Sequence, residues 1–327
     1  MTMALMDMQI EELEALLKER GQPAFRARQL FNWLSKGTPL EQMSNLPLEL
    51  REKLKEYPLG GAGIYSRLVS RLDGTRKYLF SLMDGNIIEG VLMKYNYGNS
   101  VCISSQAGCR MGCRFCASTI GGLVRSLEPS EMLRQIYHIQ KITGERVSNV
   151  VVMGTGEPMD NYDNVLRFLE LITSEDGLNI SQRNITISTC GIVPKIKELA
   201  QKHLQITLAI SLHSPNDEMR RGLMPIAMKY SIDELLDACH YYFKETNRRM
   251  TFEYSLVAGV NDQPVHAEEL AGRLKGFPCH VNLIPVNPIK ERDFKQSMPK
   301  SVMEFKKILE KNRVNVTIRR EMGADIN

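Results

Sequence analysis

The sequence predicts an α/β fold in which six βα units surround a parallel sheet, and two observations carry this prediction. From Asn99 onward, short runs rich in β-branched residues alternate with longer segments of helical periodicity. The predicted strands are nearly continuous in apolar residues, as expected where helices cover a parallel sheet. Either a barrel or an open, doubly wound sheet has this pattern, and the count of six units favours a barrel that stays incomplete.

The predicted elements follow one another at regular spacing. The strands are expected at residues 101–104, 149–153, 184–188, 205–212, 250–256, 280–284 and 314–319. The helices between them are expected at 129–142, 161–174, 193–202, 231–246, 264–274 and 299–312. Ser231 and Glu234 have the spacing of a capping box, which predicts the start of one helix.

Residues 1–92 have a different pattern and predict a small accessory domain joined to a core domain of residues 93–327. Short helices are expected at 10–20, 24–34 and 47–55, followed by strands at 66–72, 76–82 and 86–93. Aromatic and arginine side chains interleave in 24–34, an arrangement that can stack on RNA bases and contact phosphates. We favour an ordinary amphipathic helix for the aromatic residues, with Phe, Leu and Trp inward. Arg26 and Arg28 remain candidates, so residues 1–92 are predicted to bind RNA.

The composition sets broad limits on function. The 327 residues are 43% hydrophobic and 24% charged with a net charge of +4, which permits a nucleic-acid partner without requiring one. The seven cysteines are an odd number, and the first twenty residues are an acidic amphipathic segment. We therefore expect a reducing, cytoplasmic location. No apolar run approaches the roughly eighteen residues of a membrane helix, so no membrane partner is expected.

Cys109, Cys113 and Cys116 form a C-x₃-C-x₂-C run, the most informative feature of the chain. Three thiolates so close together can ligate three irons of a cubane cluster and leave the fourth iron without a protein ligand. A structural zinc site needs four ligands, and no further Cys or His occurs in the next twenty residues. Zinc binding and accidental clustering of buried cysteines are the two alternatives.

A second candidate site follows the next predicted strand, where the chain reads Gly154-Thr155-Gly156-Glu157-Pro158. A glycine turn exposes backbone polar groups to a small ligand, and the carboxylate of Glu157 can accept hydrogen bonds from an ammonium group. Functional residues of parallel α/β proteins gather at the carboxyl ends of the strands. The cysteine run and the glycine turn are therefore expected at the same rim of the sheet.

The cysteine run resembles that of the radical S-adenosylmethionine superfamily, and five segments narrow the resemblance to the family of the RNA methyltransferases RlmN and Cfr. These segments are 104–109, 153–158, 188–191, 211–216 and 282–288, in order and with family-like spacing from about Ala24 to the end. The resemblance implies an incomplete (βα)6 TIM-like barrel of the radical SAM type, with one [4Fe-4S] cluster and S-adenosylmethionine as cofactors. It also implies methylation of an adenine in 23S rRNA, at C2 for RlmN, which also acts on tRNA, and at C8 for Cfr.

Site residues are carried over position by position from this resemblance. Cys109, Cys113 and Cys116 match the cluster ligands. Glu89 matches the proton acceptor and Cys102 the thiol that resolves the protein–RNA adduct. The positions that match contacts to S-adenosylmethionine are Gly156, Glu157, Ser188, Ser211, Leu212, His213 and Asn287.

Other roles compete at some of these positions. His213 also fits a hydrogen-bonded core histidine, and an isolated Cys102 or Glu89 would be interpreted as a packing residue or a solvated charge. Cys190, Cys239 and Cys279 are assigned to packing.

The resemblance also implies a radical route, because C2 and C8 of adenine are too electron-poor to attack a sulfonium directly. In the family, one S-adenosylmethionine methylates a cysteine near the C-terminus, and a second yields a 5′-deoxyadenosyl radical that activates this methyl group. The present chain reads Arg320-Glu321-Met322-Gly323-Ala324-Asp325-Ile326-Asn327, and the carrier cysteine would lie about three residues beyond. We therefore expect this polypeptide to bind cluster, S-adenosylmethionine and RNA without turning over as a methyltransferase.

Three functions stay open beside the leading one of adenine-C2 methylation in rRNA and tRNA. They are a Cfr-type C8 methyltransferase, a non-catalytic RNA-binding relative, and a radical enzyme that acts on a protein or metabolite. The expected partners of the leading function are 23S rRNA, tRNA and an electron donor such as flavodoxin or ferredoxin. The chain is expected to be a monomer.

Overall fold

One ten-stranded sheet organises the computed structural model, which describes residues 2–326. Its strands lie in the order β1-β2-β3-β4-β7-β8-β9-β10-β11-β12. Their bounds are β1 Ala62–Val69, β2 Arg76–Leu82, β3 Ile87–Tyr95, β4 Gly98–Ile103, β7 Val147–Val152, β8 Ile185–Thr189, β9 Thr207–Ser211, β10 Met250–Leu256, β11 Cys279–Pro285 and β12 Asn315–Ile318. The seven strands predicted after Asn99 are all present.

The sheet has an antiparallel part and a parallel part. Strands β1 to β4 form an antiparallel meander. From β4 onward every neighbouring pair is parallel. The edge strands β1 and β12 do not pair with each other, but Arg319, just after β12, shares a cavity with Cys102 of β4. The sheet therefore curls without closing, which confirms the predicted incomplete barrel.

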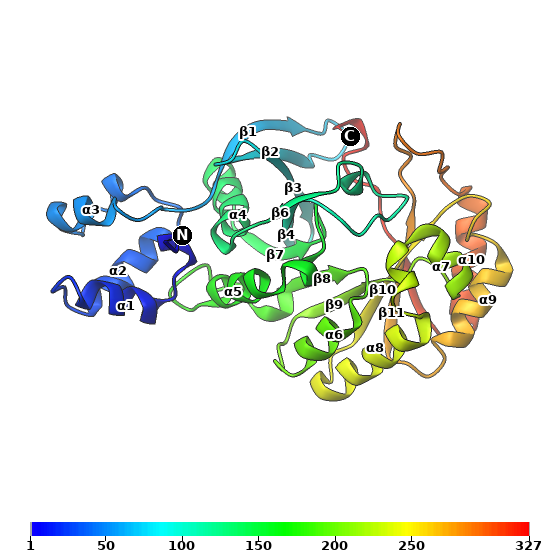
Figure 1. Cartoon of the computed structure of the whole chain (residues 1–327). Helices are drawn as coiled ribbons and strands as arrows, with labels where there is room; N and C mark the ends of the chain where they lie inside the picture. Colours follow the sequence, from blue (N-terminus) through cyan, green and yellow to red (C-terminus); the bar gives the residue numbers. More distant parts are fainter. Residues whose placement is uncertain (1, 327) are drawn as a thin grey trace.

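Helices connect the parallel strands and cover the sheet (Figure 1). The six predicted ones are α4 Pro129–Thr143, α5 Tyr162–Thr173, α6 Val193–Ala200, α8 Ile232–Thr246, α9 Pro264–Arg273 and α10 Pro299–Lys311. The capping box at the start of α8 is confirmed, because the Ser231 hydroxyl accepts from the Glu234 N–H while the Glu234 carboxylate accepts from the Ser231 N–H. The short helix α7, Asp217–Leu223, was not predicted.

The N-terminal helices form a separate layer beside the sheet (Figure 1). They are α1 Ile10–Lys18, α2 Phe25–Leu34 and α3 Leu48–Leu54. In α2, Phe31 is buried as predicted, whereas the inward position expected for Phe25 is wrong because this ring is 56% exposed. The predicted division after residue 92 falls inside β3, so the antiparallel strands and the parallel core share one sheet.

The C-terminal segment lies against the turn between β1 and β2 (Figure 1). The Gly323 N–H donates to the carboxylate of Asp73 at 2.9 Å. The Asp325 carboxylate accepts from the Ser70 hydroxyl at 2.6 Å and from the Arg71 N–H at 2.9 Å. The end of the described chain is thus fixed next to the open side of the barrel.

None of the helices within residues 2–326 combines the length and the apolar character that crossing a membrane requires.

Candidate active site

The three cysteines of the C-x₃-C-x₂-C run lie on a loop that a small hairpin presents. The hairpin consists of β5, Gln106–Gly108, and β6, Leu123–Ser126, which pair antiparallel outside the main sheet. The sequence did not predict it, because two strands of three and four residues leave no readable periodicity. Its position after β4 places the loop at the carboxyl ends of the parallel strands.

Hydrogen bonds to backbone carbonyl groups fix the shape of the cysteine loop. The Thr119 hydroxyl donates to the carbonyl oxygens of Cys113 and Cys116, at 3.1 and 2.9 Å. The Arg114 N–H donates to the carbonyl of Leu223 in α7 at 2.9 Å. Gly108 has a φ of +76° and passes so close to the Gly122 carbonyl that a Cβ atom would lie 2.0 Å from its oxygen. The loop therefore requires glycine at this position.

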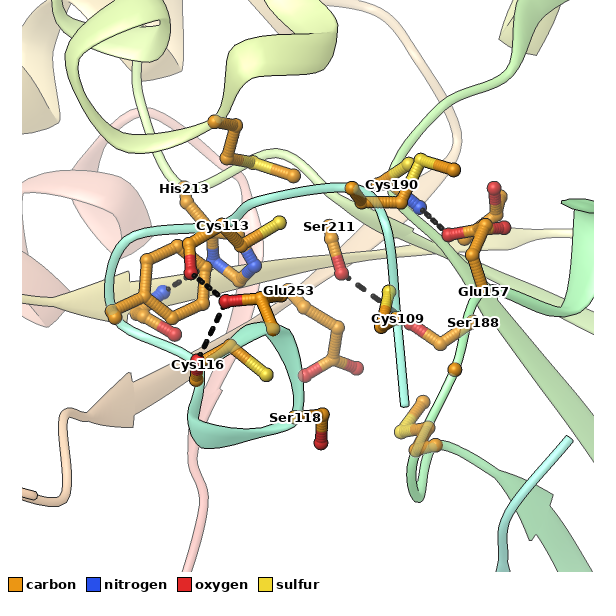
Figure 2. Close-up of a pocket in the computed structure, with 18 of the residues that line it drawn as sticks. Cys109, Cys113, Cys116, Ser118, Glu157, Ser188, Cys190, Ser211, His213 and Glu253 are labelled. Atoms are coloured by element: carbon orange, nitrogen blue, oxygen red, sulfur yellow. Dashed lines mark hydrogen bonds between the residues drawn. The ribbon is translucent and has the colours of Figure 1, made fainter. Parts of the chain in front are cut away.

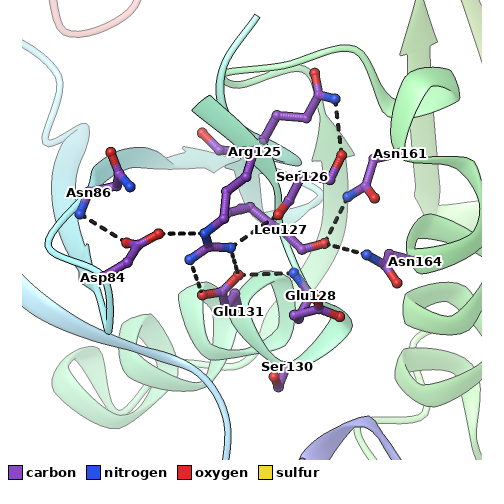
Figure 3. Close-up of polar contacts among 12 residues, drawn as sticks. Asp84, Asn86, Arg125, Ser126, Leu127, Glu128, Ser130, Glu131, Asn161 and Asn164 are labelled. Carbon is purple, nitrogen blue, oxygen red and sulfur yellow. Dashed lines mark hydrogen bonds and ion pairs between the residues drawn. The ribbon is translucent and has the colours of Figure 1, made fainter. Parts of the chain in front are cut away.

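A charged network anchors the other end of the hairpin (Figure 3). The Arg125 guanidinium donates to both oxygens of the Glu131 carboxylate, at 2.7 and 2.8 Å, and also pairs with Asp84 in the turn between β2 and β3. Glu131 in turn accepts from the Glu128 N–H at the start of α4. The Asn161 amide donates to the Leu127 carbonyl, which extends the network to the segment after β7.

A cavity of about 220 Å³ lies between the cysteine loop and the ends of the parallel strands (Figure 2). Cys109, Cys113 and Cys116 line one side. Five of the residues predicted to contact S-adenosylmethionine also line this cavity. They are Gly156, Glu157, Ser188, Ser211 and His213.

Glu157 forms a buried acidic group in the cavity wall. Its side chain is 4% exposed and accepts from the N–H groups of Cys190 and Met159, at 2.7 and 3.0 Å. Burial raises the pKa of this carboxyl, and the two N–H groups oppose the rise. The hydroxyl oxygens of Ser188 and Ser211, on the adjacent strands β8 and β9, line the same cavity and lie 3.5 Å apart. The wall therefore offers a carboxylate and two hydroxyls to a polar ligand.

His213 is hydrogen-bonded within the core and also lines the cavity. The Ser255 N–H donates to its Nδ1 at 2.8 Å, so the ring is satisfied on one side. The residue also lines the cavity, and the ring of Phe115 from the cysteine loop packs edge-on against the imidazole, with 4.7 Å between the ring centroids. Burial lowers the pKa of His213 to about 3, so the ring is a neutral group with Nε2 as its free nitrogen.

Two predicted contacts lie elsewhere. The side chain of Leu212 is fully buried in the core, and only its backbone takes part, with its N–H bonded to the Glu253 carbonyl. Asn287 is exposed and lines a neighbouring cavity. Any contact of Leu212 to a ligand here would involve the main chain.

The three thiols of the cysteine loop line one cavity and match the ligand set of a cubane cluster, in which each thiolate binds a different iron. Burial raises the pKa of Cys109 to about 11 and that of Cys113 to about 12, so ligation would displace protons.

A second cavity of about 530 Å³ adjoins the first and brings the two predicted catalytic residues together. Glu89 of β3 and Cys102 of β4 both line it, because Val91 pairs with Cys102 and Glu89 lies two residues along on the same face. Glu89 forms an ion pair with Lys77 at 3.0 Å. Burial raises the pKa of the Cys102 thiol to about 11, and the charge of Arg319 opposes the rise.

Three residues line both cavities and form the boundary between them: Met153, Ile284 and Arg319. Sequence reasoning did not single them out, nor did it single out Glu253, a buried acid on β10 whose carboxylate accepts from the Asn282 amide at 3.0 Å. A charged residue inside an apolar strand was the available signal for Glu253. Cys190, which we assigned to packing, also lines the first cavity, whereas Cys239 and Cys279 lie in the core.

Comparisons with known proteins agree with this geometry. Residues 103–271 match the family described as Radical SAM superfamily, and residues 3–58 match the Ribosomal RNA large subunit methyltransferase N-terminal domain. A crystal structure of a radical SAM methyltransferase from Sphaerobacter thermophilus superimposes with a TM-score of 0.95 at 41% identity, covering 99% of this chain and 97% of that one. Fold and site thus define a radical S-adenosylmethionine enzyme, whose cofactors are a [4Fe-4S] cluster and S-adenosylmethionine.

Curated relatives narrow the assignment further. Proteins named probable dual-specificity RNA methyltransferase RlmN are 61% identical in Lachnoclostridium phytofermentans and 62% identical in Lachnospira eligens. Each match covers 97% of this chain, with 90% and 91% of the respective relative. The chain belongs to the RlmN family of radical SAM RNA methyltransferases, which confirms the resemblance stated above.

Proposed function

We propose that this enzyme methylates carbon 2 of an adenine in 23S rRNA and in tRNA. The observation that carries the proposal is the adjacency of the two cavities, which share Met153, Ile284 and Arg319 as a common boundary. One cavity is lined by three thiols and strand-end polar groups, and the other by a thiol and a carboxylate. A reactive group formed in the first cavity would therefore lie next to a base held in the second.

In this proposal the first cavity holds both cofactors. Cys109, Cys113 and Cys116 would ligate the cluster, which when bound and reduced would supply the electron for cleavage of S-adenosylmethionine. Glu157 and the hydroxyls of Ser188 and Ser211 accept hydrogen bonds from the polar groups of S-adenosylmethionine, and Gly156 and His213 shape its site. Gly156 has a φ of +111°, and a Cβ there would lie 2.6 Å from Gln106, so the turn brings bare backbone to the cavity wall.

In the second cavity the roles belong to Cys102 and Glu89. The Cys102 thiol resolves the adduct between protein and base, and Glu89 accepts the proton that leaves the base. Lys77 orients the Glu89 carboxylate through their ion pair. Arg319 and Arg320 line the same cavity and supply positive charge for the RNA backbone. Asn287 lies at this side as well.

RNA approaches, in this proposal, over the open side of the barrel. A base inside a folded RNA is stacked, so it has to be extruded to enter a cavity beside strand ends. The N-terminal layer matches a domain named for rRNA methyltransferases, and Phe25 and Arg28 are exposed on it. In this proposal residues 1–92 therefore serve RNA binding. The proposal also includes a monomeric enzyme and a flavodoxin or ferredoxin as the electron donor.

Methyl transfer further requires a carrier thiol, which the resemblance places about three residues beyond Asn327. We therefore expect a polypeptide of residues 1–327 to cleave S-adenosylmethionine without methylating RNA. A second polypeptide that continues with Ala-Ala-Cys-Gly-Gln-Leu is expected to do both. RNA methylation by the shorter polypeptide would refute the carrier requirement.

The test of the proposed function uses the extended polypeptide with a 23S rRNA fragment and with tRNA. After anaerobic reconstitution and reduction, mass spectrometry of the digested RNA is expected to show 2-methyladenosine in both. Formation of 8-methyladenosine would assign the Cfr reaction instead. RNA binding with no cleavage of S-adenosylmethionine would assign a non-catalytic relative. Cleavage without any RNA affinity would point to a protein or metabolite substrate.

A further inference from the structure

Arg220 of α7 is a buried cation that has no ion-pair partner in the described chain. Its side chain is fully buried, and none of the ion pairs within residues 2–326 includes it. Nη2 donates to the Cys190 carbonyl at 2.7 Å and Nε to the Leu212 carbonyl at 3.3 Å. Nη1 is buried without any hydrogen-bond partner. A buried charge that lacks an ion-pair partner destabilises the folded state by several kcal/mol unless an opposite charge lies nearby.

The location of Arg220 indicates where that opposite charge belongs. Its Nη2 donates to the Cys190 carbonyl, and Cys113 packs against the apolar cluster that includes Cys190. The acidic residue about one turn before Arg220 on the same helix is Asp217. Cys113 and Cys190 line the first cavity, whereas Asp217 is a half-buried residue whose carboxylate already accepts from the Ile232 N–H. Arg220 itself does not line the cavity, so it lies behind the wall that the two cysteines form.

The helix that carries Arg220 also packs directly on the cysteine loop. Leu223 and Met224 form a small apolar cluster with Cys190, against which Met111, Cys113 and Phe115 pack. The Arg114 N–H donates to the Leu223 carbonyl. The guanidinium is therefore held in place relative to the loop by a water-excluding contact, in which a charge acts strongly over several ångströms.

We propose that Arg220 is the counter-charge of the iron–sulfur cluster and makes the cluster easier to reduce. This inference rests on the proposed ligation by Cys109, Cys113 and Cys116. Three thiolates outweigh the positive charge of an oxidised cubane core, and reduction adds one more negative charge. A fixed cation behind Cys113 stabilises the reduced state more than the oxidised one. Arg220 is thus a positioning and electrostatic residue, without contact to substrate.

The test compares three variants of the full 327-residue chain after anaerobic reconstitution. Arg220→Gln keeps a hydrogen-bond donor but removes the charge, Arg220→Lys keeps the charge, and Arg221→Gln removes an exposed charge from the same helix as a matched control. The readout is the midpoint potential of the cluster from a redox titration followed by electron paramagnetic resonance. We expect Arg220→Gln to lower the equilibrium constant for one-electron reduction at least tenfold, a negative shift of about 59 mV. Arg220→Lys and Arg221→Gln are expected to stay near the parent value.

The iron content and the thermal unfolding of the unloaded proteins complete the test. If Arg220→Gln fails to take up iron while Arg220→Lys takes it up, the counter-charge role is supported. If both variants unfold early without the cluster, or if Arg220→Gln and Arg221→Gln have equal potentials, Arg220 is a structural donor and the inference is wrong. A parent chain that binds no cluster contradicts the proposed function itself, which separates the two failures.

Discussion

The two adjoining cavities differ in how the chain builds them. The first is assembled from segments that each follow a parallel strand, and its thiols come from one eight-residue loop. The second combines antiparallel β3 and β4 with residues after β11 and β12, which are more than 180 residues further along the chain. A local sequence motif therefore predicts the first cavity. The second cavity exists only because the curvature of the sheet brings its two ends together. The comparison predicts that the two cavities serve separable steps.

Removal of one cluster ligand is the most damaging change and tests the first cavity. In Cys113→Ala one iron would lose its protein ligand, and we expect cleavage of S-adenosylmethionine to fall at least a thousandfold, with loss of bound iron. The measurement is 5′-deoxyadenosine formation together with iron analysis. Cys279→Ala, which removes a cysteine far from both cavities, is the control and is expected to keep both. Equal activity of Cys113→Ala and the parent would contradict the assignment.

Variants of the second cavity sharpen the comparison. Cys102→Ala and Glu89→Gln in the extended polypeptide are expected to retain the cluster and to form 5′-deoxyadenosine. RNA methylation is expected to fall at least a hundredfold, because these side chains act only on the base and its adduct. Both products are quantified in one reaction by mass spectrometry. Loss of 5′-deoxyadenosine in parallel with methylation would show that the cavities do not act separately.

Asp7 links the N-terminal layer to the first turn of α4, which also anchors the hairpin through Glu131. Its buried carboxyl accepts from the Ser130 N–H at the start of α4, at 2.6 Å. Burial raises its pKa to about 6 from 3.8, against the opposing effect of that N–H. The folded state thus binds this proton more tightly than the unfolded chain, so the group favours folding below about pH 4 and loses that contribution as the pH rises through 6.

Asp7→Asn stays neutral at every pH and can still accept from Ser130. At pH 8 we expect this variant to be more stable than the parent by up to about 3 kcal/mol, since two pKa units correspond to roughly that free energy. The difference is expected to vanish near pH 4. Denaturant unfolding at both pH values measures it, and a difference independent of pH would contradict the assignment.

Arg125 gives a smaller effect at the same place in the fold. Arg125→Leu leaves the Glu131 carboxylate, which is 7% exposed, without its cation, although the Glu128 N–H still donates to it. Because Arg125 itself is 32% exposed, we expect a loss of only about 1–2 kcal/mol in the free energy of unfolding. Lys94→Leu breaks the exposed pair with Glu145 and is the matched control, with an expected change below about 1 kcal/mol. Equal losses in the two variants would refute the role of Arg125 in anchoring the hairpin.

Sequence patterns predicted most of the fold because its main elements are periodic. The seven later strands and six helices were found from apolar runs, and Ser231 was found from its capping box. Helix α7, with seven residues, and the strands β5 and β6, with three and four, were missed because each spans too few periods for a pattern to be recognised. The outward position of Phe25 at the first residue of α2 was also missed, because a helix terminus has no neighbouring turn to pack against.

The sequence predicted candidate site residues only where they belong to a short motif of fixed spacing. Cys109 and Glu157 stand in short motifs that follow strands, and Ser188 stands in one that begins at the end of β8. Arg319, Glu253 and Arg220 carry no such pattern, and their importance follows from burial of charge, which depends on the tertiary structure. Leu212 also stands in such a motif, but its side chain faces the core, so the motif alone does not predict which side chains reach the cavity.

The central claim is that three thiols in the first cavity hold a cubane with one iron open to S-adenosylmethionine. The most direct measurement is iron and sulfide analysis of the anaerobically reconstituted 327-residue chain, followed by reduction with S-adenosylmethionine present. The account predicts about four irons and four sulfides per chain and the appearance of 5′-deoxyadenosine. Bound zinc, or a chain that binds no metal and releases no 5′-deoxyadenosine, would contradict it.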